Sequence, residues 1–463
     1  MAHGENVDLI ESVVNHVVSS DYKNLDQKTI AAVKTVLLDS MGVAVAGSSA
    51  AGILDLVNLV RDWGGKPEAR VLVYGDSVPA IHAALANCTM ARAWDLDDDH
   101  EGGGGHLCGS LIPTAMVLAQ YAPTKISGRE LILAVAIAAD LICRLRMSFT
   151  ARAGWTTETF APFGVVAIAS RFLGFDKQQT RDAMGLAYTQ CACNSQGTVD
   201  GALSVRLQQG LAAQAGVLAT QFAQIGFTGP KNVLQGVYGL YPLYGRDAYD
   251  ASMITRDLGS HFHVVNTSLK PYPCCKHTHN AISGTVKLVA NHGISPASIE
   301  KIVVRTNQAA YDKCASGAAK FSPAGVVDAQ FSIPVMVALG AIHGGVCLSD
   351  LISEQWKDRQ VLELARKVEV RVDPELNLTS GMIRPNIIEL SAAGRDYVER
   401  SEFVKGSPDD RMTPAECAEK FRQCIAVSAK PLGQRKVNEF MQMVNGLEHV
   451  EDAGSMTNLL MAE

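Results

Sequence analysis

The sequence predicts a mainly α-helical protein in which a large all-helical domain is interrupted by a smaller α+β domain. Three observations lead to this prediction. The chain has 463 residues, more than the about 250–300 residues at which a single hydrophobic core stops growing. Helical periodicity fills the first two thirds, and strand-like alternation begins after about residue 270. Helical periodicity then returns from Thr413 onward, so the helical domain is expected to be discontinuous in sequence.

The expected helices of the large domain are apolar on nearly every face. The first long one begins with Asp26 as a candidate N-cap and ends at Gly47. Pro79 opens an alanine-rich segment and suits the first turn of a helix. Helices without a polar face are surrounded by other helices, which predicts a central helical bundle. The expected helices are 26–47, 79–94, 111–120, 128–146, 164–174, 178–190 and 207–226.

The α+β part is marked by β-branched residues that alternate with polar ones, a pattern typical of strands. We expect residues 1–268 and 413–463 to form the helical domain with the central bundle. Residues 269–412 are expected to form the α+β, lid-like domain. The expected strands are 301–307, 367–372, 387–390 and 397–399, with helices at 281–292 and 334–344 between them.

Composition limits the partners and the compartment. Lys and Arg total 41 against 47 Asp and Glu, and the net charge of −6 argues against a nucleic-acid binder. The N-terminal segment has no basic region followed by an apolar one, so the eleven cysteines are interpreted as reduced cytoplasmic thiols. The strongest apolar stretches, 112–121 and 131–143, are shorter than the ~20 residues that span a bilayer. We expect a cytoplasmic protein with no nucleic-acid or membrane partner.

The segment WDLDDDHEGGGGHLCGSLIP, which begins at Trp94, holds the densest group of titratable residues. Asp95 and Asp99 belong to an acid cluster, and His106 follows a run of four glycines that suits neither helix nor strand. An acid cluster with histidines on a glycine-rich loop indicates a site whose groups titrate near neutral pH. The alternative is a solvated acidic loop with incidental histidines.

A second cluster, LKPYPCCKHTH, lies where the helical pattern changes to the strand pattern. Its prolines favour extended backbone, and Lys270 and His279 are among the donors that suit a carboxylate ligand. Arg206 is a third candidate, because an arginine beside an apolar helical face usually pairs with a carboxylate of the protein or of a ligand. The alternatives are an exposed linker with ordinary charges and, for Arg206, an internal salt bridge. The vicinal Cys274 and Cys275 are more typical of packing than of nucleophiles.

Motifs for organic cofactors and metals are missing from the sequence. Neither G-x-x-x-x-G-K-[ST] nor G-x-G-x-x-G after a strand is present, so nucleotide cofactors lack their usual binding loops. The cysteine spacings do not match C-x-x-C zinc sites, and the acid cluster lacks the ligand order of a calcium-binding loop. We therefore expect no cofactor and no metal, and any chemistry must come from side chains.

Four ordered blocks of sequence are similar to those of the MmgE/PrpD family. The blocks are DLDDDHEGGGGH, DGALSVRLQQGLAAQAGVLATQFAQIGFTG, KPYPCCKHTHNAI and DAQFSIP. The family includes dehydratases, decarboxylases and epimerases of small carboxylates. The resemblance implies a large helical domain interrupted by a smaller α+β domain, a homodimer, and a site between the two domains.

The resemblance also assigns residues to that site. Asp95, Asp99, His106 and Lys270 match family positions that bind a polycarboxylate and move its protons. The proposed site requires the side chains of Asp95, His106, Arg206 and Lys270 to converge in the folded protein, although Arg206 and Lys270 are far from the other two in sequence.

Two positions depart from the family pattern. Thr156 stands in or near the place of a histidine, and Val205 stands in the place of a lysine. Proton abstraction next to a carboxylate builds up negative charge that the site must neutralise. The loss of two cations therefore predicts a substrate less negatively charged than a tricarboxylate, or a different acid–base pair.

The leading hypothesis is a cofactor-independent lyase that acts on a small di- or polycarboxylate by proton transfer at the carbon α to a carboxylate. His106 is the expected general acid or base, and the tetraglycine loop is expected to close over the substrate. One alternative is an epimerase with two bases, and another is a carboxylate-binding protein without catalysis. The predicted catalytic residues are His106, Asp95 and Lys270, and the predicted substrate-binding residues are Asp99, Arg206 and His279.

Overall fold

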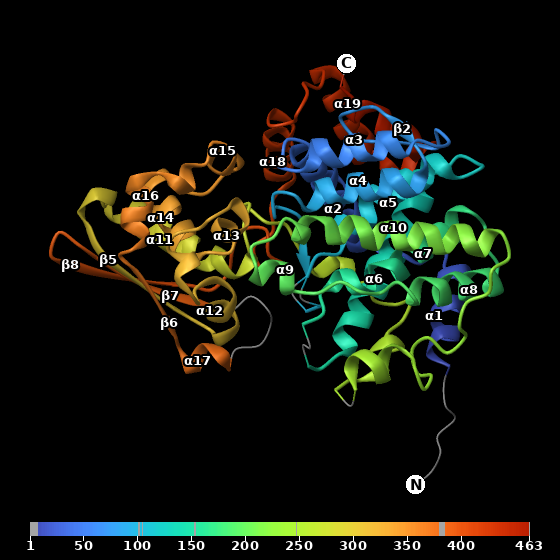
Figure 1. Cartoon of the computed structure of the whole chain (residues 1–463), viewed down its shortest axis with the longest axis horizontal. Helices are drawn as coiled ribbons and strands as arrows, with labels where there is room; N and C mark the ends of the chain where they lie inside the picture. Colours follow the sequence, from blue (N-terminus) through green and yellow to red (C-terminus); the bar gives the residue numbers. More distant parts are fainter. Residues whose placement is uncertain are drawn as a thin grey trace, which may run out of the picture.

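The computed structural model describes residues 8–100, 102–103, 105–151, 154–246, 248–378 and 385–462 (Figure 1). It consists of a helical body and a smaller part built around one four-stranded sheet. The predicted fold class, mainly α with a smaller α+β domain, is confirmed. Glu101 and Gly104, which belong to the loop expected to close over substrate, lie outside the described residues, so closure stays a prediction.

The helical body combines the N-terminal helices with two helices from the C-terminal segment. Its N-terminal helices are α1 (Leu9–Ser19), α2 (Gln27–Gly47), α3 (Ile53–Trp63), α4 (Ala80–Arg92), α5 (Cys108–Tyr121), α6 (Gly128–Ser148), α7 (Ala161–Phe172), α8 (Lys177–Tyr188), α9 (Gln196–Val199) and α10 (Ser204–Gln224). The C-terminal helices are α18 (Pro414–Ala426) and α19 (Gln434–Asn445). A short pair of strands, β1 (Ala69–Arg70) and β2 (Ser77–Val78), lies between α3 and α4.

Helix α2 occupies the centre of this body, with α4, α5, α6 and α18 packed around it. The Asp26 carboxylate accepts a hydrogen bond from the Thr29 N–H at 2.7 Å and so fixes the start of the helix. A Cβ atom at Gly47 would lie 1.8 Å from the Met90 carbonyl oxygen, so only glycine permits the close approach of α2 and α4. Close packing through small residues is therefore built into the centre of the body.

Among the described residues, α2 is the one helix whose length and composition would allow it to cross a membrane. The stretches expected to be the most apolar, 112–121 and 131–143, do not include this longer one. The surrounding helices bury 78% of the apolar stretch of α2. The apolar character of α2 is thus explained by its central position in the bundle.

The α+β part contains a sheet with the strand order β6-β5-β7-β8. Strand β5 pairs in parallel with β6 and antiparallel with β7, and β8 pairs antiparallel with β7. Helix α11 packs on β7 and β8, and α14 packs on β6. The strands are β5 (Ile299–Thr306), β6 (Val368–Val372), β7 (Asn386–Ala392) and β8 (Arg395–Ser401). The helices are α11 (Lys276–His292), α12 (Gln308–Cys314), α13 (Val326–Gln330), α14 (Ile333–His343), α15 (Leu348–Ile352), α16 (Arg359–Ala365) and α17 (Pro374–Asn377).

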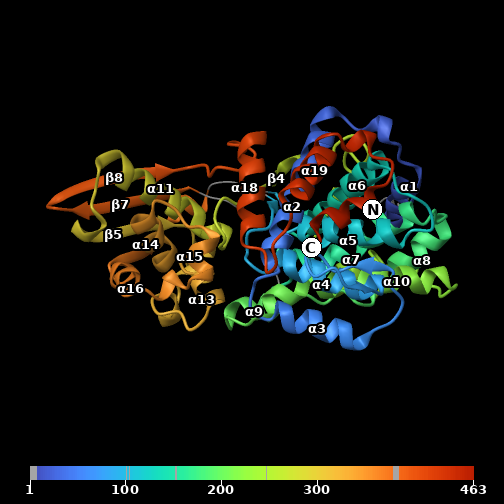
Figure 2. The same ribbon diagram turned by 90° about the horizontal axis from the view of Figure 1, so that it is seen from above.

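The chain passes between the two parts twice, and Figure 2 shows the parts side by side, joined near α18. On the outward passage, β4 (Thr267–Ser268) pairs antiparallel with β3 (Asp99–His100) of the helical body. On the return, α18 packs against α2. The first passage therefore places the residues after β4 beside the acid cluster.

Candidate active site

Residues 93–107, here called the acid loop, connect the end of α4 to the start of α5. The Asp98 carboxylate accepts hydrogen bonds from the backbone N–H groups of Leu107, Cys108 and Gly109 at 3.0, 2.9 and 3.2 Å. These groups form the N-terminus of α5, which would otherwise lack acceptors. Burial and the neighbouring Asp97 raise the pKa of Asp98 to about 6. Asp98 therefore serves as a helix cap that fixes one end of the acid loop.

Asp95 is held by two buried cations. Its carboxylate pairs with Arg92 Nη1, at the end of α4, and Oδ1 lies 3.1 Å from Lys270 Nζ. Lys270 Nζ also donates to the Asp95 carbonyl oxygen at 2.9 Å and lies 3.9 Å from Asp97 Oδ1. Burial alone would raise the pKa of Asp95, but Arg92 and Lys270 hold it below its ordinary value. Asp95 is therefore ionised at neutral pH.

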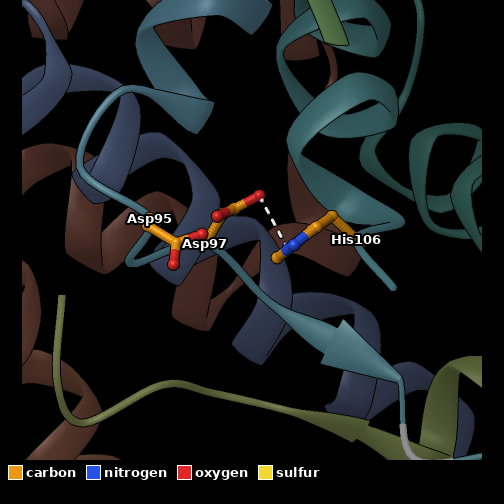
Figure 3. Close-up of side chains that lie close together, drawn as sticks. All are labelled: Asp95, Asp97 and His106. Atoms are coloured by element: carbon orange, nitrogen blue, oxygen red, sulfur yellow. Dashed lines mark ion pairs between the residues drawn. The ribbon is translucent and has the colours of Figure 1, made fainter. Parts of the chain in front are cut away.

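His106 lies against Asp97, as Figure 3 shows. Its Nδ1 atom is 3.1 Å from Asp97 Oδ2 and 2.7 Å from the Asp98 carbonyl oxygen. Because both neighbours accept hydrogen bonds, Nδ1 carries a proton and Nε2 is the atom that gains or loses a second one. Gln209 Nε2 donates to the same Asp97 oxygen at 2.9 Å and fixes that carboxylate. Burial and Arg92 would lower the pKa of His106, but Asp97 raises it above its ordinary value.

The raised pKa of His106 predicts a contribution to stability that depends on pH. A histidine whose pKa is raised on folding stabilises the fold below its unfolded pKa of about 6.5, and the contribution is lost as the pH rises through the folded value. In urea denaturation, the stability of the parent protein should exceed that of His106→Asn by more at about pH 6 than at about pH 9.

His82→Asn is the control for this measurement, because burial lowers the pKa of His82 and the pH dependence should have the opposite sign. If the difference between parent and His106→Asn is the same at both pH values, His106 is not paired with an ionised Asp97.

A cavity of about 100 Å³ lies between the helical body and the α+β part. The helical body contributes α4, the acid loop, the end of α6, and residues within 155–158 and 195–208. The α+β side contributes residues within 270–277, one residue of α12, and Phe331. Cations outnumber carboxylates in the wall, which suits an anionic ligand. The cations are Arg92, Arg146, Lys270, Lys276 and Lys313, and the carboxylates are Asp95, Asp99 and Glu158.

Four of the predicted site residues, Asp95, Asp99, His106 and Lys270, line this cavity. The pairing of Asp99 with Ser268 across β3 and β4 explains why Lys270 lies beside the acid loop. Asp99 Oδ1 is buried and has no hydrogen-bond partner among the described residues. An unpaired buried acceptor costs about 1–3 kcal/mol, a cost that a ligand with a hydrogen-bond donor would remove.

Arg206 and His279 are buried, but neither belongs to the described wall of the cavity. Arg206 Nη1 donates to the Ala51 carbonyl oxygen at 3.0 Å, and its guanidinium lies 5.6 Å from the centroid of the Trp94 ring. Burial lowers the pKa of Arg206 to about 10. His279 Nε2 lies 3.1 Å from the Cys274 carbonyl oxygen. Arg206 thus packs on the start of the acid loop and His279 contacts the backbone at Cys274, and their predicted contacts with a substrate stay predictions.

The two positions that depart from the family pattern, Thr156 and Val205, both line the cavity. Sequence reasoning counted the cations missing there but not those supplied by Arg146 and Lys313. Lys313 lies on α12 and carries no sequence signal, because only the fold brings α12 to the cavity. Arg92 is different, since its position three residues before Asp95 near a helix end is a visible signal for an ion pair.

The last residue of the tetraglycine run, Gly105, must be glycine on steric grounds. The φ of Gly105 is 149°, and a Cβ atom there would lie 1.9 Å from Thr157 Oγ1. Thr157 itself lines the cavity. Glycine at this position therefore lets the residue before His106 approach Thr157 closely.

Asp95, Asp97 and His106 place possible metal-ligand atoms within 4.8 Å of one another (Figure 3). Arg92 and Lys270 already pair with the two carboxylates. Burial alone would raise the pKa of Asp97, but His106 and Arg92 hold it well below its ordinary value. A divalent cation would have to compete with these buried cations, so the arrangement favours proton transfer over metal binding.

Removal of metal ions should therefore leave the protein unchanged. Dialysis against EDTA is expected to change neither the melting temperature nor any turnover, and added Mg²⁺, Mn²⁺ or Zn²⁺ should not stabilise the fold, because a ligand stabilises only when it binds the native state. A melting temperature that rises with metal concentration, and no longer rises in Asp97→Asn, would show that this cluster binds a metal.

Comparisons with known proteins agree with this architecture. The MmgE/PrpD N-terminal domain matches residues 11–250, and the MmgE/PrpD C-terminal domain matches residues 272–445. A cis-aconitate decarboxylase from Aspergillus terreus is 25% identical over 456 residues, covering 92% of this chain and 90% of the relative. The cis-aconitate decarboxylase of Homo sapiens is 24% identical over 476 residues, covering 98% and 94%. Because the two domain matches together span most of its length, this chain belongs to the MmgE/PrpD family.

Proposed function

We propose that this protein is a cofactor-independent lyase, a dehydratase or decarboxylase, that acts on a small di- or polycarboxylate by proton transfer at the carbon α to a carboxylate. The observation that carries the proposal is the His106–Asp97 pair beside the Lys270–Asp95 pair at a cation-rich cavity. The relatives named cis-aconitate decarboxylases support a lyase that acts on a small carboxylate.

His106 is assigned the proton transfer, through Nε2. Asp97 binds Nδ1–H, keeps the ring in one tautomer and stabilises the imidazolium. In a decarboxylation, the bond to the leaving carboxylate breaks, carbon dioxide departs, and the imidazolium protonates the carbon that keeps the electron pair. In a dehydration, a base removes the α proton, and the electron pair of the broken C–H bond forms the carbon–carbon double bond. The hydroxyl group is protonated and leaves as water. In both reactions Lys270 and Arg92 stabilise the negative charge that develops.

Asp95 is assigned the role of the second proton-transfer group, which acts opposite to His106. Its Oδ2 atom is buried and has no hydrogen-bond partner among the described residues, while Oδ1 is held by Lys270. One carboxylate oxygen is therefore left to accept a hydrogen bond from a ligand at the wall of the cavity.

A panel of hydroxylated, unsaturated and saturated di- and tricarboxylates tests the proposal. We expect one acid to lose water or carbon dioxide, which mass spectrometry and NMR of the product detect. The same reaction in deuterium oxide identifies an epimerase, since epimerisation exchanges the α proton and inverts one centre without loss of atoms. An acid that raises the melting temperature but undergoes no reaction would contradict catalysis and support a binding protein.

We further propose that the enzyme works as a cytoplasmic homodimer. All eleven cysteines are free thiols, and only Cys347 is exposed, which supports a reducing compartment. Large apolar side chains that a subunit contact would cover are exposed on the helical body, including Ile225 (71%), Val237 (80%) and Tyr238 (78%). Sedimentation equilibrium tests the dimer, and a monomer at all concentrations would contradict it.

A further inference from the structure

A buried ion pair contacts the acid loop from the C-terminal helix α18. Lys420 Nζ lies 2.6 Å from Asp39 Oδ1, on α2, and donates to the Leu96 carbonyl oxygen at 3.2 Å. The exposed fraction is 10% for the Lys420 side chain and 3% for that of Asp39. Neither residue belongs to the described wall of the cavity. The pair therefore contacts the backbone of the acid loop and not a ligand bound in the cavity.

Stability alone is a weak reason for this pair. Two buried charges lose their hydration, and apolar residues of the same volume usually hold a fold at least as well. Asp39 Oδ2 has no hydrogen-bond partner among the described residues, and burial raises the pKa of Asp39 although Lys420 opposes this. What apolar residues could not supply is the donor to the Leu96 carbonyl oxygen.

Every second residue from Trp94 to Asp98 is attached to a neighbouring part of the fold by hydrogen bonds, and Leu96 is the middle one of these three attachment points. Trp94 is attached through its Nε1–H to the Ala46 carbonyl oxygen at 3.0 Å, and through its own carbonyl oxygen to Gln330 Nε2 at 2.7 Å. Asp98 caps α5. Two carboxylates of the site, Asp95 and Asp97, lie between these points, and Asp99 follows the last of them. The Leu96 attachment thus lies between the two carboxylates that meet Lys270 and His106.

The backbone at this point needs a constraint. Asp95 has a φ of 53°, in the left-handed region that non-glycine residues rarely adopt. Such a conformation persists only where its surroundings hold it. Lys270 holds the Asp95 carbonyl oxygen, and the hydrogen bond from Lys420 holds that of the very next residue, Leu96.

We propose that Lys420 is a positioning residue for the site: by holding the Leu96 carbonyl oxygen it sets where Asp95 and Asp97 meet Lys270 and His106. Asp39 balances its charge and directs the ammonium toward the acid loop. The activity readout below rests on the proposed lyase function, whereas the backbone readout does not.

Hydrogen–deuterium exchange of the full chain tests the backbone. In Lys420→Met, the amides of residues 94–100 should exchange faster than in the parent, and those of α5 and α6 should not change. Lys420→Arg, which keeps a charged donor, should restore slow exchange. Lys34→Met is the matched control, because Lys34 also joins α2 to the C-terminal segment, with Nζ 2.9 Å from Glu448 Oε2, but contacts none of the described residues of the acid loop.

Steady-state kinetics test the consequence for chemistry. With the acid identified by the substrate panel, Lys420→Met should lower kcat by about 10- to 100-fold, because small displacements of reacting groups are costly. KM should change much less, since Lys420 does not line the cavity, and Lys420→Arg should recover most of kcat. Lys34→Met should retain the kcat of the parent.

Exchange at 94–100 that matches the parent in Lys420→Met would overturn the proposal, whether or not any acid is turned over. Faster exchange throughout α2 and α18, with no excess at 94–100, would also overturn it, because that pattern indicates a purely structural pair. If Lys420→Met does not fold, Asp39→Asn replaces it, since loss of the balancing carboxylate should likewise speed exchange at 94–100.

Discussion

Replacement of His106 by asparagine is expected to lower kcat/KM for the carboxylate substrate by about 10²- to 10⁴-fold, the usual contribution of a general acid or base. Asparagine retains a donor for the Asp98 carbonyl oxygen, which His106 Nδ1 approaches to 2.7 Å, but it has no group that titrates. The loss should appear in kcat, because the proton transfer takes place only in the transition state. Steady-state kinetics on the full chain measure it.

His343→Asn is the matched control for this experiment. His343 Nδ1 also contacts an aspartate, with Asp350 Oδ1 at 2.8 Å, but neither residue belongs to the described wall of the cavity. This variant should keep the kcat/KM of the parent. Undiminished turnover in His106→Asn would remove His106 from the mechanism and overturn the assigned proton transfer.

Replacement of Lys270 by methionine should destabilise the protein by about 3–5 kcal/mol and abolish turnover, because it removes one of the buried cations that balance the carboxylates of Asp95 and Asp97. Lys270 Nζ is buried 3.1 Å from Asp95 Oδ1 and 3.9 Å from Asp97 Oδ1. Burial alone would lower the pKa of Lys270, but Asp95 and Asp97 raise it, so the ammonium is charged at neutral pH. Methionine preserves most of the volume and removes the charge, and urea denaturation measures the stability that is lost.

Lys287→Met is the control for stability, because Lys287 pairs with Glu399 at 2.6 Å on the surface, where its side chain is 58% exposed. Its loss should cost at most about 1 kcal/mol. Combining Lys270→Met with Asp95→Asn should recover part of the lost stability but no turnover, since it removes the excess buried negative charge without restoring the site. A Lys270→Met variant as stable as the parent would contradict the buried ion pairs.

Most elements of the fold can be predicted from local patterns. The strands β5, β6, β7 and β8 follow the predicted alternation, and α14 follows the predicted apolar stretch. Helix α5 begins at Cys108, before the predicted Leu111, because a carboxylate ten residues earlier, that of Asp98, caps it. The pairing of β3 with β4 escapes prediction, because strands of two residues show no periodicity and their partners are far apart in sequence.

The candidate site can be predicted where its residues gather in short segments. Asp95, Asp99 and His106 share one segment, and Lys270 stands out in a proline-rich one. Arg206 shows the limit of such reasoning: an arginine beside an apolar face predicts a carboxylate partner, but the contact of its guanidinium with the Trp94 ring is one that no sequence pattern indicates. Partners that only tertiary structure brings together carry no such local pattern.

The contacts on the acid loop come from residues far along the sequence, which limits when they can form during synthesis. The ammonium groups that hold it belong to Lys270 and Lys420, 175 residues beyond Asp95 and 324 residues beyond Leu96. On the ribosome, the N-terminal helices emerge and begin to fold before either lysine has been synthesised. The nascent chain therefore carries the acid cluster for most of its synthesis without the geometry shown here. The contacts on the acid loop can therefore be complete only after α18 has been synthesised.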